Sequence, residues 1–565
     1  MFKLFFLFLI SFISFSQENM FLNSYFNGFE LSNIGSPFLS YTPNFSSKNL
    51  EIEPDFINNY LVEESKDNRL FDNMFFFSNI DIENSLTYIS TYNKGGFISS
   101  KFTRSVSNNS YINFYYNNLI SSGFFQFQEN SFSNLGFEYS YSNKENPYGF
   151  SLFFNSINAF YDENGGVINY DQNISDNLQQ TYFSEANSEI KFRNFLLHQY
   201  YKFNSNRLVS YKIEYNLFKK SFFDNNPSSY HYTYTPLSFA ITGNYQNIST
   251  FNHIKNKLTL HSNYFLEKNI DFSFIYNLYY HELISPNVGD LILSISNFNN
   301  QLDYKYKFHL NFCPIGHNKN NYDIKLMYTL KSSKFNGEYL LGFNKQKPNL
   351  FSEIYPANKL TNLSWGDDFY SLENFYFSLN NSINKYKIDL ILDYKRIDNF
   401  LYYNYYALIS QYTKPIDYFH LLLSKNWIYK NLFIKQSIHL QKRYLDNNNS
   451  NILPIPFFIF NQSIKYNFDL FKESNLILKF DFKIHSNYYP NTFMPLSSIF
   501  YNQDDELVGG VPFFSAGLYL NKNNFSLGII FRDIQYSFLN RNYITQDYIS
   551  SPTNLGLHIN WKFFD

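Results

Sequence analysis

Charge and cysteine are both scarce in this chain. Asp, Glu, Lys and Arg make up 16% of it, well under the roughly 25% of an ordinary globular domain. The formal net charge of -2 argues against nucleic acid as a partner. The single cysteine, Cys313, excludes an internal disulfide and a multi-cysteine metal site. The 11 histidines show no ligand spacing, so we expect no metal and no cofactor.

Long apolar runs and catalytic motifs are also missing. After residue 16 there is no run of about 18 apolar residues that could span a bilayer as a helix. The chain contains no Gly-x-Ser-x-Gly elbow, no P-loop and no Gly-x-Gly-x-x-Gly. We therefore expect that the protein is not an enzyme. A lipase or protease site assembled from different strands is recognised by geometry alone, and that alternative stays open.

Aromatic residues, in contrast, are abundant. They make up 22% of the chain, with 68 Phe and 52 Tyr. Low charge and many aromatics without a spanning helix indicate an all-β transmembrane antiparallel barrel. The alternative is a soluble all-β protein such as a propeller. The excess of Tyr favours the membrane, because a buried Tyr hydroxyl needs a partner whereas an interfacial one has water.

The chain divides into three parts. Residues 1–16 have a basic start at Lys3 and then an apolar core, and we expect a signal peptide. Residues 17–83 alternate poorly and form an irregular N-terminal segment, which is either a periplasmic lead-in or a plug in the lumen. From residue 84 to residue 565 the alternation is regular, and we expect this region to form the barrel.

Apolar and charged residues alternate with a period of two in runs of 9–11 residues, such as 385–395 and 476–485. This is the length that a tilted strand needs to cross a bilayer. A lysine facing lipid at mid-bilayer costs roughly 2–4 kcal/mol, so the charged side must face a wet lumen and the Leu, Ile and Phe side must face lipid. The charged residues expected to line the lumen are Lys385, Lys387, Asp389, Asp393, Asp469, Lys479, Asp481 and Lys483.

The two signs of charge in this set predict weak ion selectivity, since selective pores tend to carry rings of one sign. The alternative is that these are solvated positions without individual roles.

Short Asn-rich turns alternate with long connections. The long connections are expected at about 157–187, 220–250, 282–301, 442–459, 486–511 and 534–553. Outer-membrane barrels have short periplasmic turns and long outer loops, and the pattern predicts about 16–22 strands. One connection, 345–366, is long where the alternation requires a short one.

The last stretch, Asn554–Asp565, reads NLGLHINWKFFD. Its apolar face carries Leu557, Ile559, Trp561 and Phe563, and we expect this face to meet lipid. The loop before it is long, so the strand runs inward and the C-terminus is expected in the periplasm. We predict that this strand pairs with the first strand and closes the barrel. Its aromatic end also fits the region that barrel-assembly machinery reads.

Several patches resemble, in their order and spacing, the family of putative porins from Bacteroidota outer membranes. The patches are Asn33–Pro37, Lys101–Ser105, Glu163–Gly166, Gly509–Pro512, Asn524–Arg532 and Trp561–Asp565. The resemblance implies an outer-membrane β-barrel of a Gram-negative bacterium that acts as a porin. The chain departs from the family in having few Gly (20) and Pro (17).

We therefore expect a passive pore for small hydrophilic solutes, embedded in outer-membrane lipid. The alternative is a non-conducting barrel that acts as a scaffold, a secretion partner or a surface receptor. An energised transporter is a weaker third possibility, because residues 17–83 are short for a folded plug. The sequence carries no information on oligomeric state.

We predict that replacing Phe563→Ala together with Phe564→Ala lowers the amount of barrel assembled in the outer membrane, because the aromatic end of the closing strand is lost. Heat-modifiable migration of the folded barrel in gels measures this. Wild-type levels of folded barrel in the double variant would show that the strand is not an assembly signal.

Overall fold

The computed structural model describes most of the chain after residue 83. The described residues are 84–90, 95–142, 147–171, 173–175, 178–204, 206–226, 245–265, 268–281, 284–300, 304–348, 354–355, 365–366, 369–446, 452–471, 474–495, 499–537, 543–549 and 552–563. The expected signal peptide and the segment 17–83 lie outside them, as does Phe564. No helix among the described residues is long and apolar enough to cross a membrane.

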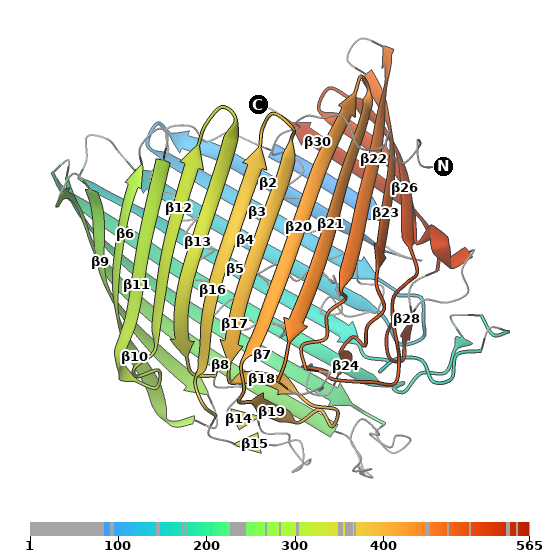
Figure 1. Cartoon of the computed structure of the whole chain (residues 1–565), viewed down its shortest axis with the longest axis horizontal. Coiled ribbons are helices and arrows are strands. Elements are labelled where there is room, and N and C mark those ends of the chain that lie inside the picture. The colour runs from blue at the N-terminus through green and yellow to red at the C-terminus, as the bar shows by residue number, and fades with distance from the viewer. Residues whose placement is uncertain are drawn as a thin grey trace.

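Antiparallel strands form one sheet of 22 strands that curls into a barrel (Figure 1). The barrel strands are β1 (Asn84–Ser90), β2 (Gly95–Ser107), β3 (Ser110–Ser121), β4 (Asn130–Ser142), β5 (Tyr148–Asp162), β6 (Ala186–Asn204), β7 (Arg207–Asp224), β8 (Tyr245–Phe265), β9 (Lys268–His281), β10 (Ile284–Asn300), β11 (Tyr304–Gly316), β12 (Tyr322–Lys331), β13 (Phe335–Gln346), β16 (Leu372–Ile383), β17 (Ile388–Asp398), β20 (Ile416–Tyr429), β21 (Leu432–Tyr444), β22 (Phe458–Phe471), β23 (Ser474–His485), β26 (Phe513–Lys522), β27 (Phe525–Arg532) and β30 (Asn554–Phe563).

Four small hairpins and a short 3-10 helix lie in the loops at one end of the barrel. They are β14 (Ile354–Tyr355) with β15 (Trp365–Gly366), β18 (Phe400–Tyr403) with β19 (Ile409–Tyr412), β24 (Thr492–Met494) with β25 (Ile499–Tyr501), β28 (Tyr543–Thr545) with β29 (Tyr548–Ile549), and η7 (Ile534–Ser537).

The first and last strands pair and close the sheet. β30 pairs with β27 on one side and with β1 on the other, where Asn84 lies opposite Phe563 and Ile89 opposite His558. Each barrel strand therefore has a partner on both sides, and the sheet has no free edge. The prediction of a closed antiparallel barrel is confirmed, at the upper end of the expected range of strand numbers.

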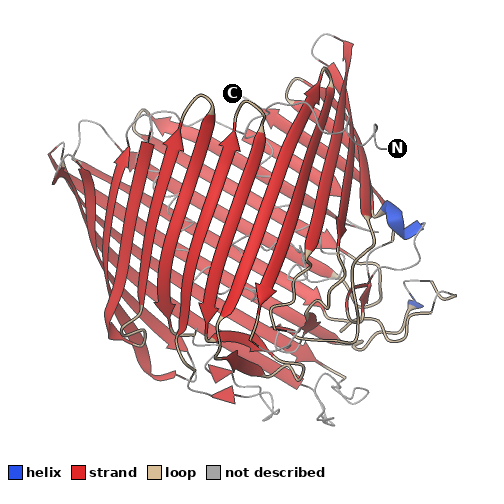
Figure 2. Cartoon of the chain, in the orientation of Figure 1, coloured by secondary structure: helices blue, strands red, loops and turns tan. Residues whose placement is uncertain are grey.

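The long connections all lie at one end of the barrel, as expected, and the connections at the other end are short (Figure 2). We call the end that holds the start of β1 and the end of β30 the short-turn rim, and the other end the long-loop rim. At the short-turn rim β26 and β27 are joined by two residues, and Asn523 has a φ of 49° there. Asparagine tolerates this left-handed conformation better than most residues do.

One expected long connection, 282–301, is in fact the strand β10. Pro286, Asn287 and Gly289 within it look like a turn. The structure accommodates Pro286 and Asn287 in an irregularity between Ile284 and Val288, beyond which β10 pairs continuously with β9, including Gly289 with Leu278. Counting β10 as a strand also removes the misfit at 345–366. The connection between β13 and β16 then falls at the long-loop rim with the other long loops.

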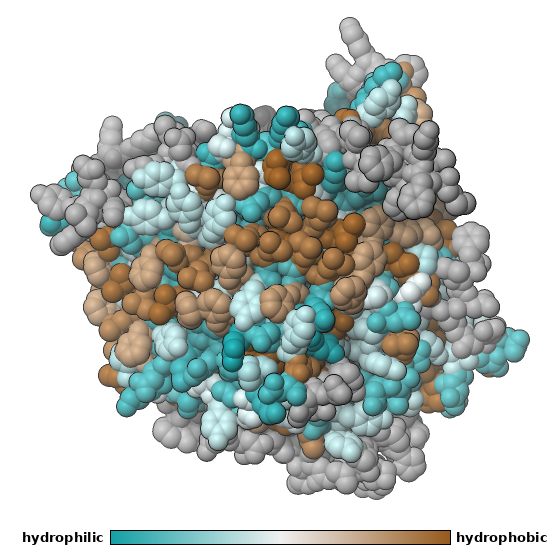
Figure 3. Space-filling model, viewed as in Figure 1, coloured by the Kyte–Doolittle hydropathy of each residue, from teal (hydrophilic) through white to brown (hydrophobic). Residues whose placement is uncertain are grey.

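The outer face of the wall is apolar. In the middle of β17, for example, Leu392 points outward and is 38% exposed, whereas Asp393 points inward and is 4% exposed. Figure 3 shows the outward side chains of this side as a hydrophobic band between hydrophilic ends. This is the surface that a barrel presents to lipid.

Part of the inner face departs from the expected wet lumen. Phe97, Leu119 and Phe132 lie opposite one another on successive strands, on the same face as Lys101, and all three are buried. They belong to a cluster that also contains Ile89, Ile157, Ala159, Tyr161, Ile190, Phe192, Phe218 and Phe251. The expectation that Leu, Ile and Phe face only lipid is therefore wrong for β1–β8 near the long-loop rim, where contacts among inward side chains remove them from water.

Two inward-facing tyrosines lie over glycines of the neighbouring strand. A Cβ on Gly136 would come within 1.9 Å of the Tyr115 ring, and one on Gly342 within 2.0 Å of the Tyr376 ring. Each pair occupies opposite register positions. Glycine is required at these two places because any side chain would collide with the ring.

The facing of β17 yields a test. We expect Leu392→Lys to lower the free energy of unfolding by about 2–4 kcal/mol, because it places a charge in lipid. Ile391→Lys is the matched control, since it adds the same charge at the next position on the lumen face. Urea titration of the protein refolded into lipid vesicles measures both. Equal losses would contradict the assigned facing.

Candidate functional site: the lumen wall and the loop layer

Basic residues outnumber acidic ones on the inner face of the wall. The inward-facing lysines and arginines are Lys101, Lys202, Lys212, Lys220, Lys255, Lys257, Lys305, Lys307, Lys325, Lys331, Lys395, Lys435, Arg443, Lys465, Lys479, Lys483, Arg532 and Lys562. The inward-facing acids are Glu138, Glu214, Asp224, Asp271, Asp290, Asp323, Glu338, Asp389, Asp393, Asp469 and Asp481. We call this surface the lumen wall.

Lys385 and Lys387 lie outside the strands. They fall in the turn between β16 and β17 at the short-turn rim, and Lys387 has a φ of 52°. The strand expected to start at residue 385 starts at Ile388 instead. The alternation of lysine with apolar residues runs on through the turn, so it does not mark where the strand begins.

Asp389 and Asp393 lie on the inward face of β17 and are hydrogen-bonded. Asp389 accepts from the Ser382 hydroxyl and, at 3.3 Å, from the Ser424 hydroxyl. Asp393 accepts from the Ser378 hydroxyl at 2.6 Å. Asp389 thus ties β17 to both of its neighbours, β16 and β20, and the Ser378 bond ties Asp393 to β16.

Asp393 also joins two histidines whose role was missed in the sequence. His420 Nδ1 lies 2.9 Å from Asp393, and His420 Nε2 lies 3.2 Å from His439 Nδ1. The chain of contacts runs across β17, β20 and β21. An aspartate that orients an imidazole is one half of a catalytic triad, but no serine or cysteine nucleophile contacts His420 in these bonds. The available signal was that both histidines occupy the lumen face by the period-two alternation.

The other four predicted lumen residues lie on β22 and β23. Asp469 is near the short-turn rim, opposite Asn475. On β23, Lys479, Asp481 and Lys483 share the inward face, and Lys479 Nζ lies 2.8 Å from Asp481. The structure therefore brings together three residues of the sequence-based set on one strand, while Asp389 and Asp393 lie on β17, four strands away around the wall.

The apolar residues of the closing strand lie on its outer face. Leu557, Trp561 and Phe563 are exposed to at least 37%, and Ile559 lies on the same face between Leu527 and Tyr88. The Trp561 and Phe563 rings meet edge-on, with centroids 5.0 Å apart. Their aromatic surface stands at the short-turn rim, where a membrane interface favours it.

The loops at the long-loop rim hold one another through backbone and side-chain bonds, and we call them the loop layer. The Val167 N–H donates to the Asp547 carbonyl at 2.8 Å. The Thr545 hydroxyl donates to the Asn491 carbonyl at 2.8 Å, and the Tyr405 hydroxyl donates to Asp505 at 3.0 Å. These bonds join the β5–β6, β17–β20, β23–β26 and β27–β30 connections.

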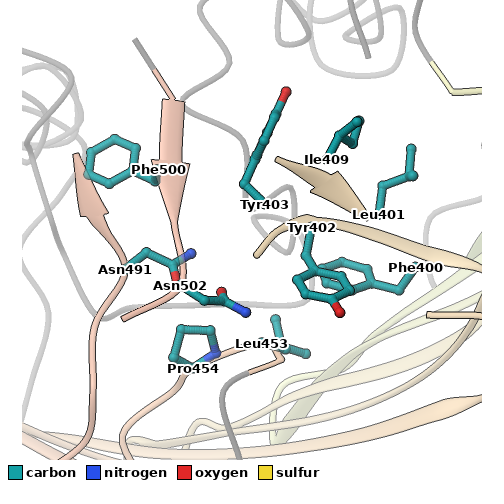
Figure 4. Close-up of a pocket in the computed structure, with 10 residues that line it drawn as sticks. All are labelled: Phe400, Leu401, Tyr402, Tyr403, Ile409, Leu453, Pro454, Asn491, Phe500 and Asn502. Carbon is teal, nitrogen blue, oxygen red and sulfur yellow. The ribbon is translucent and has the colours of Figure 1, made fainter. Parts of the chain in front are cut away.

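A cleft opens within the loop layer between the β18–β19 and β24–β25 hairpins (Figure 4). It encloses about 380 Å³, including open solvent at its mouth. The rings of Phe400 and Tyr402 stack along one side, with an interplanar angle of 1°. Asn491 is 7% exposed, and its side-chain oxygen has no hydrogen-bond partner. The cleft thus brings an aromatic face and an unpaired acceptor together.

Buried carboxyl groups in the loop layer have raised pKa values. Burial raises the pKa of Asp547 to about 6, against the Tyr182 hydrogen bond, which lowers it; Asp505 and Glu506 raise it further. Burial also raises the pKa of Glu163 to about 7, although the Ser188 hydroxyl lowers it. Among the described residues, no cluster of His, Cys, Asp and Glu has the geometry to hold a metal ion.

The closed wall, its apolar exterior and its charged interior define a transmembrane β-barrel of the outer-membrane type. The chain belongs to the family described as "Putative porin", whose model matches residues 10–565. No curated protein matches the chain.

Solved structures of similar fold include receptors and transporters for iron compounds. The ferric-catecholate import receptor Fiu from E. coli K12 has a TM-score of 0.60 at 10% identity, over 86% of this chain and 82% of that one. The FrpB iron transporter from Neisseria meningitidis has 0.61 at 10%, over 86% and 83%. The ferric yersiniabactin uptake receptor FyuA from Yersinia pestis has 0.59 at 7%, over 85% and 80%. At these identities the likeness concerns the fold alone.

The pKa of Asp547 predicts a pH dependence of the loop layer. A buried acid whose pKa is raised favours the neutral form, so docking of the β5–β6 loop is strongest below the ordinary aspartate value of about 3.8 and weakens as pH rises through about 6. We expect a loss of roughly 1 kcal/mol, allowing for partial exposure. Asp547→Asn should remove this step.

Limited proteolysis of the loop layer across this pH range measures the docking. Burial raises the pKa of Glu163 to about 7, so a separate change near pH 7 should persist in Asp547→Asn. Asp171→Asn, in the β5–β6 loop, is the control and should show the same pH profile as the wild type. An unchanged profile in Asp547→Asn would exclude its role.

Proposed function

We propose that the protein is a passive pore for small hydrophilic solutes in the outer membrane of a Gram-negative bacterium. The observation that carries this proposal is the charged lumen wall inside a closed, apolar-faced barrel. Charged side chains in such numbers require water, so the interior contains a polar path rather than a packed core. Membership of a porin family supports the same function. In this proposal the protein has no catalytic role.

The same proposal places the short-turn rim and the C-terminus in the periplasm and the loop layer outside the cell, because long loops face outward in such barrels. It retains residues 1–16 as a signal peptide, barrel-assembly machinery as a partner and a source in the Bacteroidota.

The second candidate is a surface receptor. The cleft in the loop layer favours it, since stacked rings beside the unpaired Asn491 oxygen are suited to holding a ligand. The solved structures of similar fold are described as uptake receptors for ferric compounds. A receptor of this kind would bind one ligand stoichiometrically, and unrelated sugars would not cross the membrane through it.

Liposome swelling distinguishes the two candidates. We expect intact protein to admit small sugars and to exclude larger ones, because a passive pore sorts solutes by size. The same assay with residues 17–83 removed tests whether that segment obstructs the lumen. The segment has eleven acidic and three basic residues, so it is complementary in charge to the lumen wall, and faster swelling after its removal would identify it as a plug.

Absence of swelling would count against the passive-pore function. If neither the intact nor the shortened protein supports swelling, while heat-modifiable migration shows folded barrels in the liposomes, the passive-pore function is wrong. Co-purification of a stoichiometric ligand or partner in that case favours the receptor.

A further inference from the structure

Charge is segregated between the lumen wall and the rest of the molecule. The whole chain has a formal net charge of -2, yet lysine and arginine outnumber aspartate and glutamate on the lumen wall. The excess of acids therefore lies elsewhere, in loops, on the outer face and in the N-terminal region. A solute inside the barrel meets a wall with a positive net charge.

Two pairs of lysines face each other directly across adjacent strands of this wall. Lys212 lies opposite Lys257 on β7 and β8, and Lys465 lies opposite Lys479 on β22 and β23. Like charges in opposed positions destabilise a sheet. One acid stands beside each pair, Glu214 at 3.3 Å from Lys212 and Asp481 at 2.8 Å from Lys479. Each group therefore retains a positive charge.

The second pair belongs to a larger group on three adjacent strands. Lys435 is opposite Ser463, which is two residue positions from Lys465, and Lys483 is opposite Asn461, four positions along β23 from Lys479. The Lys465 ammonium stands 6.0 Å from the centre of the Phe433 ring. We call Lys435, Lys465, Lys479 and Lys483 the lysine cluster. Asp481 and Asp469 are the only acids on this face of β21–β23 among the described residues.

Acids elsewhere on the wall do little to balance this cluster. The Asp393 side chain is 1% exposed and is occupied by Ser378 and His420. Asp323 lies 2.8 Å from Lys325, and Asp271 lies 2.8 Å from His261. Acids that are paired or buried contribute little field in the lumen, whereas clustered lysines in a low-dielectric wall raise the local concentration of anions.

We propose that the lumen selects small anions, such as inorganic phosphate and carboxylates, and that the lysine cluster is a principal part of this selectivity. The proposal rests on the proposed pore function and names its solute class. It replaces the weak selectivity expected from the sequence, where both signs of charge were counted without their positions. Lysines that line a pore favour anions because they lower the energy of a negative charge within it.

Ion selectivity in planar bilayers tests the proposal with the full chain. Under a gradient of KCl, we expect chloride to be about twofold or more as permeant as potassium. Lys465→Gln with Lys483→Gln should bring the two permeabilities close together while leaving the conductance steps present. The matched control is Lys425→Gln with Lys442→Gln, which removes two lysines from the outward face of the neighbouring strands β20 and β21 and should change nothing.

Conducting steps that favour potassium, or show no preference, would overturn the proposal while leaving the pore intact. Selectivity that is unchanged in the Lys465 and Lys483 variant would remove the lysine cluster from it. If the protein never conducts, the pore function fails and the cluster is tested by binding. The phosphorus NMR line of inorganic phosphate should then broaden when wild-type protein in micelles is added. An anion site is supported if the broadening is lost in the Lys465 and Lys483 variant and kept in the Lys425 and Lys442 control. No broadening by the wild type would exclude an anion site.

Discussion

Backbone groups within a bilayer have no water to bond with, and the fold of this protein depends on that constraint. Every strand must meet its neighbour's N–H and C=O groups along its length, so the sheet has to close on itself. β30 completes the closure because it has β27 on one side and β1 on the other. In the closed sheet, alternate side chains face lipid or lumen. A slip of one residue in the pairing of β30 with its neighbours would move Trp561 and Phe563 into the lumen.

This constraint explains what could be predicted from the sequence. The lipid-facing side of a strand must be uncharged, so strands such as β23 alternate with a period of two. The closing strand was recognisable for the same reason, from Leu557, Ile559, Trp561 and Phe563 alone. Strand β10 was missed because Pro286 and Gly289 are turn residues by local rules. A bulge in the pairing with β9 accommodates Pro286, and Gly289 pairs regularly with Leu278. Lys385 and Lys387 were misplaced because a turn can extend the alternation of the strand that follows.

Side-chain contacts between neighbouring strands could not be predicted from the sequence. The bonds of Asp393 with His420 and of His420 with His439 depend on the register of three strands, and no local pattern encodes register. The apolar inner cluster around Phe97 and Phe132 was missed for another reason. A strand that is apolar on both faces loses its alternation, and local periodicity then cannot assign an inner face. The cleft beside Asn491 requires three loops to meet, those that contain Phe400, Leu453 and Phe500.

The two faces of the wall differ in the free-energy cost of placing a charge on them. A charge on the outer face costs several kcal/mol, so that face is restricted to apolar and interfacial residues whatever the protein does. A charge on the wet inner face costs little, and folding is nearly indifferent to its sign. Positions such as Lys465 and Lys479, opposed at some cost to the sheet, are therefore poorly explained by stability. An excess of one sign in a place where folding does not require it is better explained by what passes through the lumen.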